Sequence, residues 1–168
     1  MSEANLKERK MDFDIINGVL RRYNGKEENV VIPNGVTAIG ENAFANCESI
    51  KYVEIPNSVT AIGEYAFSGC RSLKHIEIPG GVAITGEHAF WLCESLESVK
   101  IQNGVKTIGK FTFSGCKSLN SVEVPSSVWA ISDYAFYICP NLKTIYIPKD
   151  CYCYSKWNEE CPVVAIRY

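Results

Sequence analysis

Cysteine is the residue type in this chain with the widest chemical range, because thiolates bind metals, form disulfides and attack electrophiles. The chain has eight cysteines in 168 residues. A constant spacing of 23 residues, however, separates five of them: Cys47, Cys70, Cys93, Cys116 and Cys139. Such a spacing indicates one structural unit copied along the chain. We therefore interpret these five as buried, reduced thiols that act as small apolar side chains.

Three further cysteines, Cys151, Cys153 and Cys161, lie outside this spacing. They have no histidine nearby, and three thiols alone make a poor zinc set, so we expect no metal and no other cofactor. We expect unpaired thiols in this segment, with a disulfide such as Cys153–Cys161 as the alternative.

Two histidines are the remaining candidates for acid–base chemistry. We expect His75 to face outward from a strand close to Glu77, and His88 to lie on the opposite side of the molecule. A histidine–glutamate pair on an open sheet is ordinarily solvated surface. The sequence also contains no phosphate-binding glycine loop and no metal-ligand spacing. We therefore expect that the protein is not an enzyme.

The elements that carry these residues are copies of one unit, I-P-x-x-V-x-x-I-G-x-x-A-F-x-x-C-x-S-L-x-x-V-x-I-P. Its last part alternates apolar and polar residues, as in a half-buried strand with Ile76 and Ile78 inward. One such unit cannot bury its apolar face alone and must stack on its neighbours. The phenylalanine column of the repeat is Phe44, Phe67, Phe90, Phe113 and Phe136.

Two features of the repeat lead to local predictions. The glycine column (Gly40, Gly63, Gly86 and Gly109) predicts turns with positive φ, and the segment 64–69 predicts one short helical or 3-10 turn. In the third copy, Thr85 occupies the inward isoleucine column and Ile84 precedes it. This swap predicts either a weakened third coil or an inward shift of Ile84.

The repeat string resembles the BspA-type leucine-rich repeat, also called the Treponema pallidum type, over about residues 30–149. The resemblance implies a leucine-rich repeat solenoid of about five repeats with a parallel β-sheet on the concave face. Short helical or 3-10 turns and extended segments are expected on the other side. Members of the family are typically bacterial or protozoan surface proteins implicated in adhesion and host-protein binding, and the family offers no catalytic motif.

Four segments are predicted along the chain: a charged tail (1–11), an N-terminal β-cap (12–32), the solenoid (33–149) and a C-terminal cap (150–168). Asn17-Gly18 and Asn24-Gly25 are strong hairpin signals, so the N-terminal cap is predicted to be a hairpin or small antiparallel meander. The C-terminal segment breaks the repeat and is expected to cover the last coil.

Composition limits the classes of partner. The net charge of −2 does not suggest a nucleic-acid surface, and no apolar run is long enough for membrane insertion. The first residues do not resemble a signal peptide. We therefore expect a cytoplasmic protein as the sequence is written, or a cell-surface or secreted one if it is a domain of a longer protein.

The outward side of the concave sheet is the predicted binding surface, because solenoids bind partners along such extended faces. We expect a protein or glycan partner and a non-enzymatic interaction function. Its predicted residues are Tyr52, Glu54, His75, Glu77, Ser98, Lys100, Ser121, Glu123, Thr144 and Tyr146.

The alternative is a structural or self-associating solenoid, a possible homo-oligomer. It would oligomerise through its ends or through an apolar patch on the Trp91 side. Trp91, Leu92 and Trp129 stand where other copies carry smaller or more polar residues, which suggests an interface.

Overall fold

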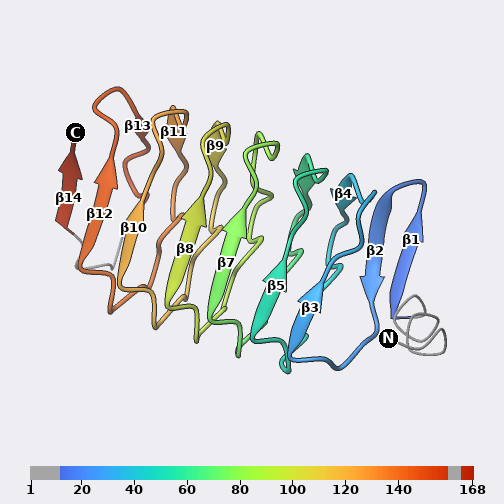
Figure 1. Cartoon of the computed structure of the whole chain (residues 1–168). Helices are drawn as coiled ribbons and strands as arrows, with labels where there is room; N and C mark the ends of the chain where they lie inside the picture. The colour runs from blue at the N-terminus through green and yellow to red at the C-terminus, as the bar shows by residue number, and fades with distance from the viewer. Residues whose placement is uncertain (1–11, 159–163) are drawn as a thin grey trace.

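The computed structural model of the chain is a parallel β-solenoid of about six turns (Figure 1). The structure describes residues 12–158 and 164–168. Within those ranges it contains strands and turns and no helix. The predicted charged tail and Cys161 lie outside the described residues.

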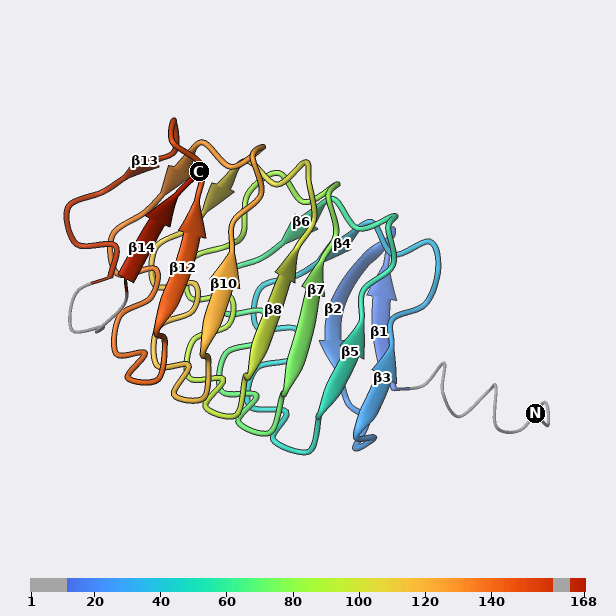
Figure 2. The ribbon, with the colours of Figure 1, turned by 60° about the vertical axis from the view of Figure 1, so that its left-hand side comes forward.

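One side of the solenoid is a seven-stranded sheet in which all neighbouring strands are parallel (Figure 2). Each turn of the solenoid supplies one strand, so residues 23 positions apart lie side by side. The strands are β3 (Asn29–Val31), β5 (Tyr52–Glu54), β7 (His75–Ile78), β8 (Ser98–Ile101), β10 (Ser121–Glu123), β12 (Thr144–Ile147) and β14 (Val164–Arg167).

Short strands on another side of each coil form two smaller sheets. The four-stranded sheet holds β1 (Phe13–Ile16), β2 (Val19–Tyr23), β4 (Ala38–Ile39) and β6 (Ala61–Ile62). The three-stranded sheet holds β9 (Thr107–Ile108), β11 (Ala130–Ile131) and β13 (Tyr152–Cys153). Between them, the third copy contributes only isolated bridges, from Thr85 to Ile62 and from Ile84 to Thr107.

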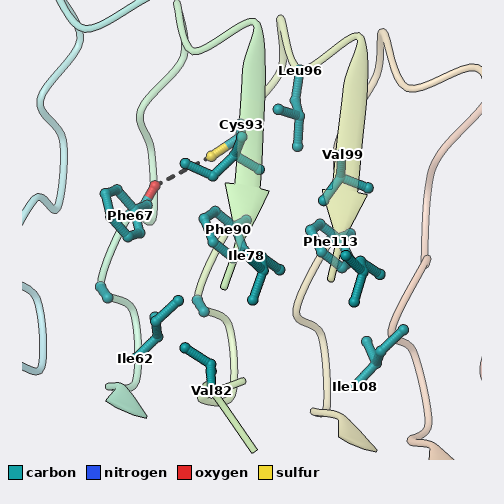
Figure 3. Close-up of a cluster of buried hydrophobic side chains, with 14 of the residues drawn as sticks. Ile62, Phe67, Ile78, Val82, Phe90, Cys93, Leu96, Val99, Ile108 and Phe113 are labelled. Carbon is teal, nitrogen blue, oxygen red and sulfur yellow. Dashed lines mark hydrogen bonds between the residues drawn. The ribbon is translucent and has the colours of Figure 1, made fainter. Parts of the chain in front are cut away.

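The core lies between these sheets and contains the inward columns of the repeat. The phenylalanine rings are fully buried and stack coil on coil, with ring centroids 4.8 Å apart for Phe44 and Phe67. The centroids of Phe67 and Phe90, both labelled in Figure 3, are 5.2 Å apart. Burying a side chain of this size contributes roughly 1.5–3 kcal/mol. Since each ring is covered by the next coil, the contribution depends on stacking, as the spacing predicts.

The segment opposite the seven-stranded sheet consists of turns, not of the helical or 3-10 turn that the sequence suggests. The backbone N–H groups of this segment donate alternately within their own coil and to the next coil. Ser68 and Cys70 donate to the carbonyl three residues earlier, whereas Tyr65 and Phe67 donate to carbonyls of the next coil. Because Tyr65 also has a positive φ of 53°, a regular helix cannot continue through it.

The glycine column has a different role from the predicted one. None of its four members has a positive φ; that conformation occurs two positions later, at Asn42, Tyr65, His88, Phe111 and Tyr134. A Cβ on Gly63 would instead lie 2.7 Å from the backbone nitrogen of Glu41 in the preceding coil. Glycine is needed here because two backbones approach closely.

The N-terminal cap begins with the predicted hairpin. β1 and β2 pair antiparallel around Asn17 and Gly18, both of which have positive φ. The second predicted turn, at Asn24-Gly25, is wrong. β2 pairs in parallel with β4, and β3 joins the other sheet, so the segment between them crosses the solenoid end instead of reversing direction.

The third copy keeps Thr85 buried and leaves Ile84 exposed, so the predicted inward shift of Ile84 is wrong. Thr85 Oγ1 accepts a hydrogen bond from the backbone N–H of Gly109 at 3.0 Å. It also lies 3.2 Å from Thr112 Oγ1. Thr112 itself replaces the alanine of the repeat, so two departures from the pattern contact each other.

The C-terminal segment follows the path of a further coil even though its sequence departs from the repeat. Cys151 donates its N–H to Pro148, as Val128 does to Pro125. β13 then extends the three-stranded sheet and β14 extends the seven-stranded sheet.

Candidate functional site

The outward face of the seven-stranded sheet brings the ten predicted binding residues together in two rows. Nine are exposed and Thr144 is half-buried. Strand pairing aligns them coil by coil, with no gap along the sheet. The first row is Tyr52, His75, Ser98, Ser121 and Thr144; the second is Glu54, Glu77, Lys100, Glu123 and Tyr146.

Side chains of the first row are ordered by contacts with one another. The rings of Tyr52 and His75 stack with centroids 5.7 Å apart. On its other side, His75 Nδ1 is hydrogen-bonded to Ser98 Oγ at 2.6 Å. These contacts hold an imidazole, a phenol and a hydroxyl in place on the surface.

In the second row, a carboxylate is the centre of a polar cluster. Glu77 Oε1 lies 2.8 Å from Lys100 Nζ and accepts a hydrogen bond of 2.6 Å from Gln102 Nε2. These two donors, Gln102 first, lower the pKa of Glu77. Gln102 is itself fixed, because its Oε1 accepts from the N–H of Gly80 at 3.0 Å. Glu77 is therefore ionised and held in one orientation at neutral pH.

Beside this cluster lies an open groove of about 700 Å³. Glu54, Glu77 and Gln102 supply polar groups to it, and Asn34 and Asn57 line it where the chain leaves the strands. The repeat pattern did not indicate these two asparagines or Gln102 as binding residues. Gln102 did carry a signal, since it stands where the other copies have proline after the strand (Pro33, Pro56, Pro79, Pro125 and Pro148).

The rows extend further than predicted at the C-terminal end. Val164 and Ile166 of β14 pair with Thr144 and Tyr146, and their side chains are 62% and 42% exposed. β14 breaks the repeat, so no column of the sequence assigns it to the face. The surface therefore changes from acidic and polar at Glu54 and Glu77 to apolar at β14.

The three residues of the predicted apolar patch lie in different settings. Trp91 packs edge-on against the rings of Tyr65 and His88, and Leu92 is half-buried. Trp129 is 60% exposed, and no ring contact joins it to Trp91 among the described residues. Trp91 instead borders a column of stacked rings on the turn side, formed by Tyr65, His88, Phe111 and Tyr134.

Four of the five regularly spaced cysteines occupy a buried setting that suppresses reactivity. Cys47 in the first coil is half-buried, so the predicted burial of all five is wrong for this one. Cys93 Sγ donates to the carbonyl of Phe67 in the preceding coil at 3.2 Å (Figure 3), and Cys70, Cys116 and Cys139 make the equivalent bond. Burial raises the pKa of Cys93 to about 12. Among the described residues no disulfide links two cysteines, and no group of side chains is arranged to hold a metal ion.

Comparison with known proteins agrees with this architecture. The model of the BspA type leucine-rich repeat region matches residues 22–143 and 85–159, with six copies. The chain belongs to the BspA-type leucine-rich repeat family. Its fold is one that serves protein-interaction modules, and members of the family are typically non-enzymatic.

Solved structures of bacterial leucine-rich repeat proteins are similar to this repeat protein. The T. pallidum protein is 37% identical (TM-score 0.74) over 77% of this chain and 63% of its own. A Bacteroides ovatus protein is 36% identical (TM-score 0.57), over 74% of this chain and 38% of its own. A Eubacterium ventriosum protein, 24% identical with a TM-score of 0.71 over 88% of this chain and 47% of its own, supports the fold alone.

This chain therefore spans less than two thirds of the length of each of these proteins. A search of curated proteins finds no match. Across residues 12–158 and 164–168, no helix has the length and apolar character to span a membrane.

Proposed function

We propose that this repeat protein is a non-enzymatic interaction module that binds a protein partner across the outward face of its seven-stranded sheet. The observation that carries the proposal is the order of that face. Tyr52, His75 and Ser98 are held by mutual contacts, as are Glu77 and Lys100. A surface ordered before binding loses less side-chain entropy on association, which favours affinity.

Charge and shape indicate the kind of partner surface. The second row carries three carboxylates and one ammonium group, so a basic protein surface complements it. Tyrosines stand near both ends of the face, Tyr52 and Tyr146, each more than two-fifths exposed. Tyrosine is frequent among residues that dominate binding energy. Adhesion to a host protein, as implied by the family resemblance, is one specific form of this function.

The test compares two charge-reversed proteins in binding to a captured partner. The face variant carries Glu54→Lys and Glu123→Lys. The control carries Glu41→Lys and Glu64→Lys, two exposed glutamates outside the seven-stranded sheet. Both proteins change net charge equally, so a general charge effect on binding affects them alike.

The partner is isolated on immobilised wild-type protein from extracellular-matrix extract, and its affinity is measured by surface plasmon resonance. We expect the face variant to lose about tenfold or more in affinity, equivalent to about 1.4 kcal/mol, while the control keeps wild-type affinity. Equal affinities for the two variants would show that the partner binds elsewhere.

A second candidate function is self-association through the C-terminal end. Among the residues that the structure describes, β14 pairs only with β12, and all four of its residues are exposed. An exposed edge strand is a template for pairing with another chain. If this function holds, the wild-type protein is a dimer or larger in light scattering, and Ile166→Lys converts it to a monomer. A wild-type monomer at high concentration would exclude it.

A further inference from the structure

Cys153 stands in a chemical setting unlike that of the regularly spaced cysteines. It ends β13, which pairs with β11 and is the edge strand of the three-stranded sheet, and its side chain is half-buried. Cys70, Cys93, Cys116 and Cys139, in contrast, are fully buried, and each donates to a backbone carbonyl. Solvent therefore has access to Cys153.

A guanidinium group lies beside the sulfur of Cys153. Arg167 Nη2 is 3.6 Å from Cys153 Sγ. The same side chain is anchored through Nη1, which donates to the carbonyl oxygens of Lys149 at 3.0 Å and Cys151 at 3.1 Å. Because these bonds fix the guanidinium, its positive charge stays next to the sulfur, where it favours the thiolate.

A second thiol contributes in the same direction. Cys151 is buried two residues away, and the interaction between the two thiols raises the pKa of Cys151 and lowers the pKa of Cys153 to about 7. Arg167 lowers the pKa of Cys153 further by its charge, against the opposing effect of partial burial. Of the two thiols, Cys153 is therefore the one that loses its proton first.

We propose that Cys153 is a nucleophilic thiolate that undergoes thiol–disulfide exchange with small-molecule disulfides, with Cys151 and Arg167 as its positioning residues. In this step Cys153 Sγ attacks one sulfur of the disulfide. A protein–S–S–R bond forms, the original S–S bond breaks, and RS⁻ leaves with the electron pair. The protein thiol is oxidised and half of the disulfide is reduced. The proposal is independent of the binding face.

The probe is oxidised glutathione, added to the intact, folded protein over a range of pH. After an acid quench, peptide mass spectrometry measures the adduct at every cysteine. We expect the adduct at Cys153, with a rate that rises to a plateau around a midpoint near pH 7. For an ordinary thiol the midpoint lies at about pH 8.5. Cys116, fully buried in the same molecule, is the internal reference and stays unmodified.

Variants separate the positioning residues from structural effects. Arg167→Gln raises the midpoint, Arg167→Lys keeps much of the shift because it keeps the charge, and Cys153→Ser abolishes the adduct. Cys161→Ser leaves the reaction at Cys153 unchanged. The wild-type pH profile needs no substitution, so the proposal remains testable if a variant unfolds.

Several results would overturn the proposal. They are an adduct at Cys161 and not at Cys153, a midpoint for Cys153 near that of an ordinary thiol, and a midpoint that does not move in folded Arg167→Gln. A Cys153–Cys161 disulfide in the freshly isolated protein would overturn it as well, because Cys153 would then have no free thiolate.

Discussion

The buried threonine pair supports a quantitative test of how the third coil tolerates its departure from the repeat. One coil before Gly109, the equivalent glycine, Gly86, donates its N–H to the backbone carbonyl of Ile62. Gly109 donates instead to the hydroxyl of Thr85. Thr85→Val keeps the shape of the side chain and removes the hydroxyl that accepts from Gly109 and contacts Thr112 Oγ1. We therefore expect the substitution to leave a buried amide without a partner.

An unsatisfied buried donor costs about 1–3 kcal/mol. No cavity forms, since valine and threonine have nearly the same volume, so the loss is attributable to the hydrogen bonds of the Thr85 hydroxyl, to Gly109 and to Thr112. The assay is urea unfolding followed by circular dichroism, with amide hydrogen exchange at Gly109 as the local measurement. We expect faster exchange of that amide together with the lower free energy of unfolding.

Thr60→Val is the matched control. The Thr60 hydroxyl donates to the carbonyl of Thr37 at 3.2 Å but is exposed, so water can replace the bond. We expect an effect within about 0.5 kcal/mol. If Thr85→Val and Thr60→Val changed the free energy of unfolding equally, the hydroxyl of Thr85 would not be the acceptor on which the third coil depends.

Three further predictions concern other columns. Burial lowers the pKa of His88, so the folded state favours neutral imidazole. Stability should be complete above the ordinary pKa of 6.5 and fall as the pH drops below it, and His88→Phe should remove that pH dependence in thermal unfolding. Cys93 should resist iodoacetamide at pH 8 until urea unfolds the chain; labelling of the native protein at that site would contradict the raised pKa. Gly86→Ala should destabilise the protein by about 1–3 kcal/mol in the same urea assay, because the new Cβ would overlap the carbonyl of Gly63, and a neutral outcome would refute the close-approach argument.

The period of the repeat was sufficient to predict the direction in which most side chains point. Phe90, Leu96 and Cys93 are buried, and His75 and Glu77 face outward, as their columns require. This succeeds because an identical coil stacked on itself gives every member of a column the same surroundings. The outward rows followed from the same argument, although binding by those residues remains a prediction.

Contacts between different columns were not predictable in this way. Asn24-Gly25 has the composition of a hairpin turn, but the path of β3 into the other sheet determines the backbone there. Thr85 and Thr112 belong to different columns and different copies, so the periodic pattern does not place them together. Arg167 reaches Cys153 from another sheet, and that contact has no signal in the sequence.

The turn columns give the solenoid a direction. Tyr23, Asn42 and Tyr65 all donate their N–H groups to the following coil, and Tyr134 and Phe136 donate to carbonyls at 156 and 157. Along these columns each coil donates toward the C-terminal end, so a bare coil at either end would offer the pattern that a second molecule needs to continue the solenoid. Both ends depart from that pattern. β1 covers the first coil as an antiparallel partner of β2, and Trp157 turns its own N–H back to the carbonyl of Tyr154. A head-to-tail assembly that continued the columns would therefore need these two caps to open first.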